Sequence, residues 1–319
     1  MKSVQELEKF YNTDLENNLN TLENERKGLV KKLIPIIIIG ILALGGALLI
    51  FFSTQTIILS IIIGIIVIGG GIYLSTNMIS KYKNKFKKEI IDKIVKFIDP
   101  VLEYNPEDYI TKSEYMNSEL FKKNPDRYKG EDYVAGKIGE TPIRFSEVHS
   151  EYYTTDNKGN RHYHTIFKGL FFIADFNKRF KGKTFVLPDV AQSTFGDVLG
   201  HFFQSWNKGR GELVKLEDSE FEEIFVVYAD DQVEARYILS TSLMERIKKY
   251  KQRTGKKIFI SFVDNNIYVA ISYNKNLFEP KIFSTITDFN HIKEYYDDLM
   301  LAVSLVEDLN LNLRIWADE

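Results

Sequence analysis

The chain has no cysteine among its 319 residues. Disulfide bonds, thiolate zinc sites and cysteine nucleophiles are therefore excluded, and a reducing compartment is compatible with the composition. A second absence is local, because no charged residue and no histidine occurs between Leu33 and Leu74, a tract dominated by Ile, Leu and Gly. An uncharged tract of this length is typical of a segment embedded in a membrane.

Motifs for common cofactors are also lacking. The glycines form no Walker-type loop and no dinucleotide-binding fingerprint, and no nucleophile elbow occurs. From Pro100 onward the chain carries 29 Lys/Arg against 35 Asp/Glu. This mildly acidic balance argues against a nucleic-acid partner. We predict no cofactor and no nucleic-acid binding, and the sequence leaves open whether the protein is an enzyme.

The uncharged tract (residues 33–76) predicts two transmembrane helices, 33–52 and 57–74. At about 1.5 Å per residue each covers roughly 30 Å, the thickness of a bilayer core. Four polar residues, Ser53 to Thr56, connect them, so the helices must form an antiparallel hairpin. A cleaved signal peptide would begin nearer the N-terminus and would not be followed at once by a second span. A buried hairpin in a soluble protein would not need to be so free of polar residues.

Basic residues flank the hairpin on both sides. Arg26, Lys27, Lys31 and Lys32 precede the first span, and the second is followed by Lys81, Lys83, Lys85, Lys87 and Lys88. Because Lys and Arg resist translocation, we predict a multi-pass protein of the cell membrane with both termini cytoplasmic. The five lysines after the second span are also candidates for contact with anionic lipid, although they could be the topology signal alone. Small residues in both spans, among them Gly40 and Gly70, permit close helix packing and a homo-oligomer.

Two cytoplasmic helices are expected next to the hairpin. Within residues 1–32, apolar side chains recur at three- and four-residue steps, which predicts an amphipathic helix that packs either on its own protein or on a partner. Residues 77–99 predict a basic helix with an apolar side. It should end at Asp99, because the residue before Pro100 is disfavoured in a helix. The apolar positions of the two helices are Val4, Leu7, Tyr11, Leu15, Leu19 and Leu22, and Phe86, Ile90, Ile94, Phe97 and Ile98.

Residues 100–319 predict a cytoplasmic α+β domain with an antiparallel sheet and grouped helices. The cluster Asp156 to Asn160 between two long β-runs predicts a hairpin, and Asp264 to Asn266 predicts a second one. The expected strands are 141–155, 161–176, 183–187, 212–216, 224–228, 257–263, 267–273 and 311–315. Capping patterns predict helices at 232–239 and 243–254, and a longer helix begins near Asp288.

Histidines give the only suggestion of a metal site. His162 and His164 stand two residues apart on one strand and therefore share a face. If Thr155 pairs with Arg161, then His164 lies opposite Tyr152. His149 then lies opposite Phe167, on the other face of the sheet. Exposed histidines without a metal are the alternative. The acidic stretch from Glu217 to Glu223 lacks the spacing of a calcium loop and predicts a solvated loop.

Three segments carry a resemblance to a known family: 167–189 (FKGLFFIADFNKRFKGKTFVLPD), 213–247 (LVKLEDSEFEEIFVVYADDQVEARYILSTSLMERI) and 309–316 (LNLNLRIW). Together they resemble the uncharacterised bacterial family known as domain of unknown function 3137. The resemblance implies a membrane hairpin before the domain, a bacterial inner membrane and a LemA-type membrane protein as a possible partner. It implies no activity and no catalytic residue.

The sequence therefore favours a membrane-anchored binding or scaffold module that recognises another protein. Two alternatives stay open. One is a membrane-associated enzyme, for which His162 and His164 are candidate metal ligands, and the other is a sensor of anionic lipid surfaces.

Overall fold

The computed structural model describes residues 2–54, 57–176, 180–189, 211–309 and 311. They form two compact units. The helical unit comprises Met1–Phe97 and Phe278–Tyr295, and the sheet unit comprises Ile98–Leu277 and Tyr296–Glu319. The boundary between the units at Phe97 and Ile98 is close to the domain boundary expected at Pro100. Residues 278–295, however, belong with the N-terminal helices.

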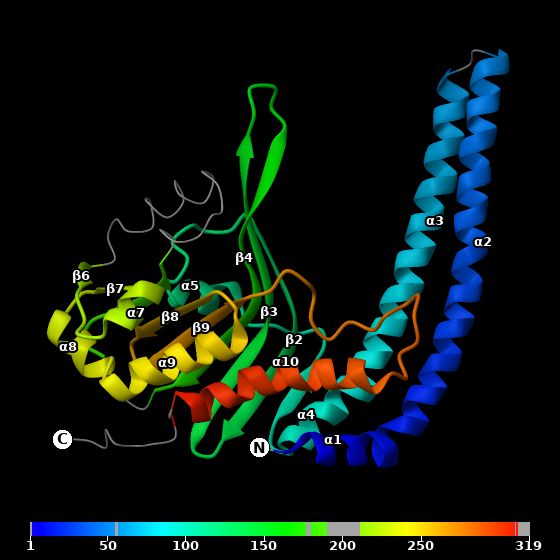
Figure 1. Ribbon diagram of the computed structural model, residues 1–319. Coiled ribbons are helices and arrows are strands. Elements are labelled where there is room, and N and C mark those ends of the chain that lie inside the picture. The colour runs from blue at the N-terminus through cyan, green and yellow to red at the C-terminus, as the bar shows by residue number, and fades with distance from the viewer. Residues whose placement is uncertain (1, 55–56, 177–179, 190–210, 310, 312–319) are drawn as a thin grey trace. The chain divides into compact units, whose positions relative to one another are not determined.

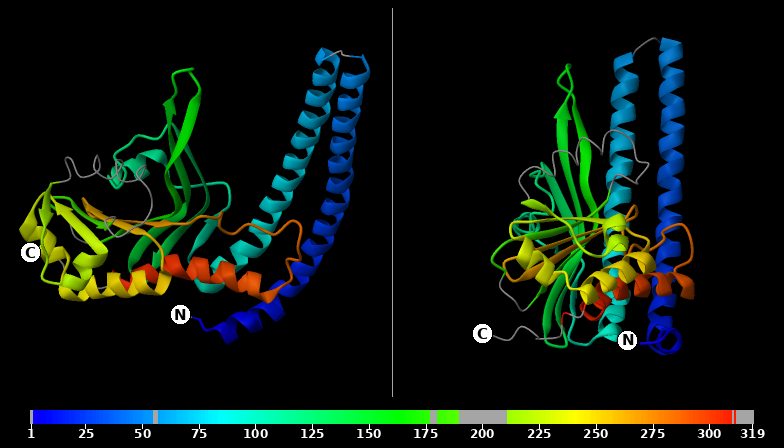
Figure 2. Two further views of the ribbon diagram at one scale, coloured as in Figure 1. Left: turned by 45° about the horizontal axis from the view of Figure 1, so that its top comes forward. Right: turned by 60° about the vertical axis from the view of Figure 1, so that its left-hand side comes forward.

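Long helices make up most of the helical unit (Figure 1). Helix α1 (Val4–Phe10), a π-helical turn (Tyr11–Leu15) and α2 (Glu16–Thr54) follow one another without interruption. The return path consists of α3 (Ile57–Phe86), a second π-helical turn (Lys87–Ile91) and α4 (Asp92–Ile98). In both views of Figure 2, α2 and α3 run side by side as an antiparallel hairpin.

The amphipathic face of the first helix packs on its own protein, which was one of the two alternatives. Leu7, Leu15, Leu19 and Leu22 are completely buried, as are Phe86, Ile90 and Ile94 from the expected apolar side of the second. Phe10 stacks on Phe97 with ring centroids 4.2 Å apart. The two helices that flank the apolar hairpin therefore share one hydrophobic core.

Residues 278–295 are tied to these helices by polar contacts. The Tyr11 hydroxyl donates a hydrogen bond of 2.5 Å to the carbonyl of Thr287. Arg26 donates to the carbonyl of Ile282 at 2.8 Å, and the amide of Ile286 donates to Glu23 at 3.2 Å. A prediction based on contiguous sequence could not assign this segment to the helical unit, because it lies about 180 residues beyond α4.

An apolar surface is exposed along α2. The continuous helix Val4–Ile50 is long and apolar enough to cross a membrane, and 6% of its most apolar stretch is buried inside the protein. Ile41, Leu42 and Leu49 are 63%, 68% and 72% exposed. This N-terminal helix can therefore serve as a membrane anchor.

The sheet unit contains a nine-stranded sheet in which all neighbouring strands are antiparallel, in the order β1-β2-β3-β4-β9-β8-β5-β7-β6 (Figure 1). The predicted α+β class is confirmed, and most predicted strands occur within one or two residues of their expected ends. The expected strand 311–315 lies almost wholly outside the described residues. The strands are β1 (Glu103–Asn105), β2 (Arg127–Ile138), β3 (Thr141–Thr155), β4 (Arg161–Asp175), β5 (Thr184–Pro188), β6 (Glu212–Val214), β7 (Phe225–Ala229), β8 (Ile258–Val263) and β9 (Asn266–Ser272).

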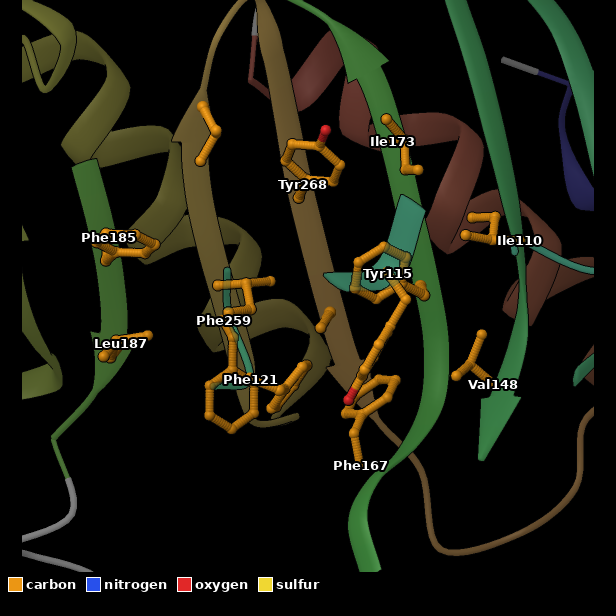
Figure 3. Close-up of a cluster of buried hydrophobic side chains, with 14 residues drawn as sticks. Ile110, Tyr115, Phe121, Val148, Phe167, Ile173, Phe185, Leu187, Phe259 and Tyr268 are labelled. Atoms are coloured by element: carbon orange, nitrogen blue, oxygen red, sulfur yellow. The ribbon is translucent and has the colours of Figure 1, made fainter. Parts of the chain in front are cut away.

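An aromatic core fills one face of this sheet (Figure 3). Tyr115 of α5 (Lys112–Asn117) stacks on Phe121 at 5.3 Å and packs on Phe171 at 5.2 Å. Phe259 of β8 and Phe185 of β5 extend the cluster along the sheet. Tyr115 thus packs α5 against this face of the sheet. The cluster also contains side chains of β3 and β4, the two strands that carry the candidate site.

Among the described residues, four further helices belong to the sheet unit. They are α7 (Ser219–Ile224), α8 (Gln232–Ile238), α9 (Thr241–Thr254) and residues 296–308 of α10 (Phe289–Asp308). The prediction of a solvated loop for the acidic stretch from Glu217 to Glu223 is wrong, because most of this stretch belongs to α7 and its N-cap. Asp218 caps that helix by accepting from the amide of Phe221 at 3.0 Å. Asp218 and Glu220 also pair with the largely buried Lys248 of α9 at 2.9 and 3.0 Å.

The β3–β4 hairpin extends beyond its neighbours in the sheet (Figure 1). Strand β2 pairs with β3 only as far as Glu151, and β9 pairs with β4 only as far as Gly169. Within the described residues, Tyr152 to His164 therefore have no flanking strand. The projecting part of the hairpin exposes both of its faces.

Candidate functional site

The turn of the β3–β4 hairpin is organised around Asp156. Its Oδ1 accepts hydrogen bonds from the amides of Lys158 and Asn160, each at 2.8 Å, and its Oδ2 accepts from Asn160 Nδ2 at 3.0 Å. His162 Nε2 lies 3.2 Å from the same oxygen. The hydrogen bonds from Asn160, and then the one from His162, lower the pKa of the Asp156 carboxyl to about 2. These bonds fix the register of the two strands.

We expect Asp156 to titrate with a midpoint near pH 2 in the folded chain. Because the pKa is depressed on folding, the contribution of this turn is present above about pH 4 and is lost as the pH falls through about 2. Carboxyl chemical shifts of the labelled protein measure the midpoint. Asn160→Ala should raise it, since Asn160 provides the largest stabilisation of the charged form. A midpoint near the ordinary 3.8 in the unmodified chain would contradict this interpretation.

One face of the β2–β3–β4 region gathers cations and aromatic rings. In-register pairs place neighbours on the same face. Arg127 lies opposite Glu151, Lys129 opposite His149, and His149 opposite Lys168. Further along β3, Tyr153 lies opposite Tyr163 and Thr155 opposite Arg161. We call this surface the cationic face and define it by Arg127, Lys129, Tyr153, Arg161, Tyr163 and Lys168.

The arginines of the cationic face lie against tyrosine rings. The Arg127 guanidinium carbon is 3.3 Å from the centroid of Tyr163, and that of Arg161 is 4.5 Å from the centroid of Tyr153. The two rings themselves are 6.0 Å apart. Such cation–π contacts hold long side chains in defined positions while leaving their charge in place. The cationic face is therefore partly preorganised.

The cations of this face are not neutralised within the described part of the chain. There, Arg127, Lys129, Arg161 and Lys168 have no carboxylate within 4.0 Å. His149, between the two lysines, has a lowered pKa because of burial first and then the charges of Lys168 and Lys129, opposed by Glu151. The register also puts the Glu131–Glu147 pair on this face, next to Lys129 and His149. The positive charge is therefore concentrated toward Arg127 and Arg161, on a unit whose sequence is acidic overall.

The opposite face of the same hairpin carries the two candidate histidines. His164 stacks on Tyr152 at 5.0 Å, as the predicted register required, and its Nε2 lies 2.9 Å from Thr154 Oγ1. Lys123 lies over Tyr152 at 3.7 Å. The histidines thus contact different partners, Thr154 and Asp156. A metal bound by His162 and His164 stays a prediction.

His149 pairs with Lys168, whereas Phe167 was expected. A β-bulge between Ser150 and Glu151 shifts the register by one residue. His149 Nε2 instead lies 3.5 Å from Thr165 Oγ1 and 3.7 Å from Glu151. It is on the face opposite to His164, as predicted. The bulge explains why the pairing was right near the turn and wrong at the base of the hairpin.

Glu131, Asp132 and Glu147 form a carboxylate group that sequence reasoning missed. Their ligand atoms lie within 4.8 Å of one another, and no other group of three potential metal ligands occurs among the described residues. Asp132 and Glu147 are buried. They already accept hydrogen bonds, from the Tyr104 hydroxyl and from the amide of Leu277 at 2.7 Å. The group lies at the β2 bulge, where Asp132 takes a φ of 64°.

The juxtamembrane lysines differ in their surroundings. Lys87 is 1% exposed and lies 3.1 Å from Glu279, so its ammonium group cannot reach lipid headgroups, in contrast to the prediction. Lys83 pairs with Glu279 at 2.6 Å and Lys85 with Glu25 at 2.5 Å. Lys81 and Lys88 are exposed. A role in lipid contact stays a prediction for the four lysines other than Lys87.

Fold and surface together define a class of protein: an antiparallel α+β unit linked to long helices, one of which can anchor in a membrane. Residues 165–311 match the family model described as "Protein of unknown function (DUF3137)". The resemblance to that family is thus confirmed over this range, which includes most of β4 and most of the sheet unit beyond it.

Other comparisons add little. No curated protein matches the chain. A crystal structure of the mycobacterial trehalose monomycolate transport factor A, TtfA, is similar with 8% sequence identity and a TM-score of 0.34. The match covers 66% of this chain and 93% of the other. At this level it defines neither the fold nor a role.

Proposed function

We propose that this chain is a membrane-anchored module whose sheet unit binds another protein on the cytoplasmic side. The observation that carries the proposal is the exposed apolar surface of α2. Leaving side chains such as Leu42 and Leu49 in water costs about 25 cal/mol for each Å² of apolar surface that stays exposed. A lipid bilayer covers such a surface without a protein partner.

A two-pass topology follows if α3 spans the membrane as well. Its Ile65 and Ile66 are each 67% exposed, and it runs antiparallel to α2. Both helices are flanked by Lys and Arg at the end where the chain enters and leaves the hairpin. This asymmetry supports cytoplasmic termini. The bilayer is then the first partner of the chain.

Glycines on the hairpin support a homo-oligomer within the membrane. A Cβ atom added to Gly71 would lie 3.2 Å from Ile36, so this glycine serves the packing of α3 on α2. Added at Gly40, Gly46 or Gly64, it would meet nothing within 4 Å. Small residues on an open helix surface let a second copy approach closely.

Binding is favoured over catalysis because the sheet unit exposes tyrosine and arginine, which are enriched in the energetically important parts of protein interfaces. Family resemblance suggests a LemA-type membrane protein as the partner. The proposal is tested by purifying the full chain from native membranes in mild detergent at low salt. We expect a second protein at a constant ratio to the chain. Repeated recovery of the chain alone would overturn the proposal.

Two measurements on the same preparation test the two alternative functions. Stoichiometric metal that is lost in a His162→Ala/His164→Ala variant would favour a metal-assisted enzyme. Binding to anionic vesicles that is lost when Lys81 and Lys88 are replaced would favour a lipid sensor.

A further inference from the structure

We propose that the cationic face is the docking surface of the module and that it binds an acidic segment of a partner protein. This inference rests on the proposed function and names the partner's chemistry. Four basic side chains lie along one face of three adjacent strands. Glu151 lies opposite Arg127 on this face, and the Glu131–Glu147 pair follows Lys129 and His149 at its other end. An acidic chain supplies the complementary charge.

Charge contrast within the sheet unit makes this face selective. Acidic residues outnumber basic ones from Pro100 onward, so this part of the chain carries a net negative charge. Near Arg127 and Arg161, which have no carboxylate within 4.0 Å among the described residues, the interaction with an acidic chain is favourable. Electrostatic complementarity of this kind steers association and fixes which surface is used.

The tyrosine rings add affinity that charge alone would not provide. Tyr153 and Tyr163 lie side by side and are half-buried, with the arginines held against them. Because the guanidinium groups are already positioned, less side-chain entropy is lost when a carboxylate binds them. The pattern of rigid aromatic rings and arginines is that of an interface centre.

An anionic membrane is a poorer occupant of this face. Membrane-inserting loops bury apolar side chains in the acyl region. Among the described residues, the exposed large hydrophobic side chains include none between Val101 and Leu213, so the whole hairpin lacks them. Its tip is instead Asp156 to Asn160, which is polar. A surface of cations and phenol rings, with no large exposed apolar side chain to insert into lipid, fits an acidic protein segment better.

The test uses the full chain in phosphatidylcholine nanodiscs and a fluorescent peptide of ten glutamates as the probe. We expect binding that weakens as salt is raised. Arg127→Glu/Arg161→Glu should weaken it by roughly tenfold or more, as expected for residues at an interface centre. Lys137→Glu/Lys215→Glu is the matched control, since it reverses two exposed charges elsewhere on the sheet unit. This control should bind within about twofold of the original chain, because distant exposed charges are screened.

A second variant distinguishes a preorganised binding surface from a nonspecific attraction between charges. Tyr153→Ala/Tyr163→Ala keeps every charge and should still weaken binding severalfold, with circular dichroism confirming the fold. Equal loss in the arginine variant and its control, or no loss in the tyrosine variant, would overturn the proposal. Stronger arginine-dependent binding to vesicles containing phosphatidylglycerol than to the peptide would also overturn it, in favour of a membrane surface.

The two proposals fail separately. If native membranes yield the same partner with the original chain and with Arg127→Glu/Arg161→Glu, the docking surface is wrong and the module role stands. If the peptide binds the cationic face but no partner is recovered, the module role is wrong.

Discussion

Replacing Gly169 with alanine is expected to destabilise the sheet unit by about 4 kcal/mol or more, the range of severe backbone and packing defects. Gly169 has a φ of 149° in β4, and a Cβ atom there would lie 2.1 Å from the carbonyl oxygen of Ile271 in β9. Since that oxygen belongs to backbone, β9 must move away from β4. Chemical denaturation of the full chain in detergent, followed by tyrosine fluorescence, measures the loss.

Gly159→Ala is the matched control for this experiment. Gly159 has a φ of 83° in the hairpin turn, and an added Cβ atom would meet nothing within 4 Å. Only conformational strain remains, about 1 kcal/mol for a residue with a left-handed backbone. If the two variants lost the same stability, the close approach of β4 and β9 would not be the cause.

Placing arginine at the centre of both apolar helices is expected to release the chain from the membrane. Leu42 and Ile66 lie near the middle of the uncharged stretches of α2 and α3, and both are exposed. At a helix centre in a bilayer each arginine costs about 2.5–3.5 kcal/mol on insertion scales. The Leu42→Arg/Ile66→Arg chain should move largely from the carbonate-resistant membrane pellet to the soluble or aggregated fraction.

The control for membrane release places the same charges just outside the uncharged stretches of α2 and α3. Gly28→Arg and Asn77→Arg lie beside the basic flanks, where a long side chain reaches the aqueous interface. A Cβ atom at Gly28 meets nothing within 4 Å. This variant should stay in the pellet. Retention of both variants would show that lipid does not surround the centres of the helices.

The sequence predicted the β3–β4 hairpin well where local chemistry decides the structure. Asp156 and Asn160 form the turn through their own side chains, so the pairing of Thr155 with Arg161 could be predicted from the turn residues. Further from the turn, the bulge at Ser150 and Glu151 shifted the pairing of His149. The extra residue is Ile166 of β4, which pairs with no residue of β3, so the alternation on β3 itself carries no sign of the shift.

The candidate site could be predicted only in part. His162, His164 and Tyr152 were placed correctly because they lie on one hairpin. The cationic face was missed because Arg127 and Lys129 come from β2, whereas the first strand predicted from the sequence begins at residue 141. Glu131, Asp132 and Glu147 were missed for the same reason. Since β2 carries a bulge and the left-handed Asp132, its alternation is broken at the positions that matter.

The assignment of residues 278–295 to the helical unit bears on how this protein can be dissected. Helix α10 is continuous from Phe289 to Asp308, and its residues up to Tyr295 belong to the helical unit and those from Tyr296 to the sheet unit. A soluble fragment beginning at Pro100 would retain Ile286, Ile292 and Tyr295 but lose the N-terminal helices that belong to the same unit. Such a fragment would aggregate through these side chains even with its sheet intact. Insolubility of such a fragment would then mean that apolar side chains have lost the helices that belong to the same unit. It would not mean that the sheet is misfolded.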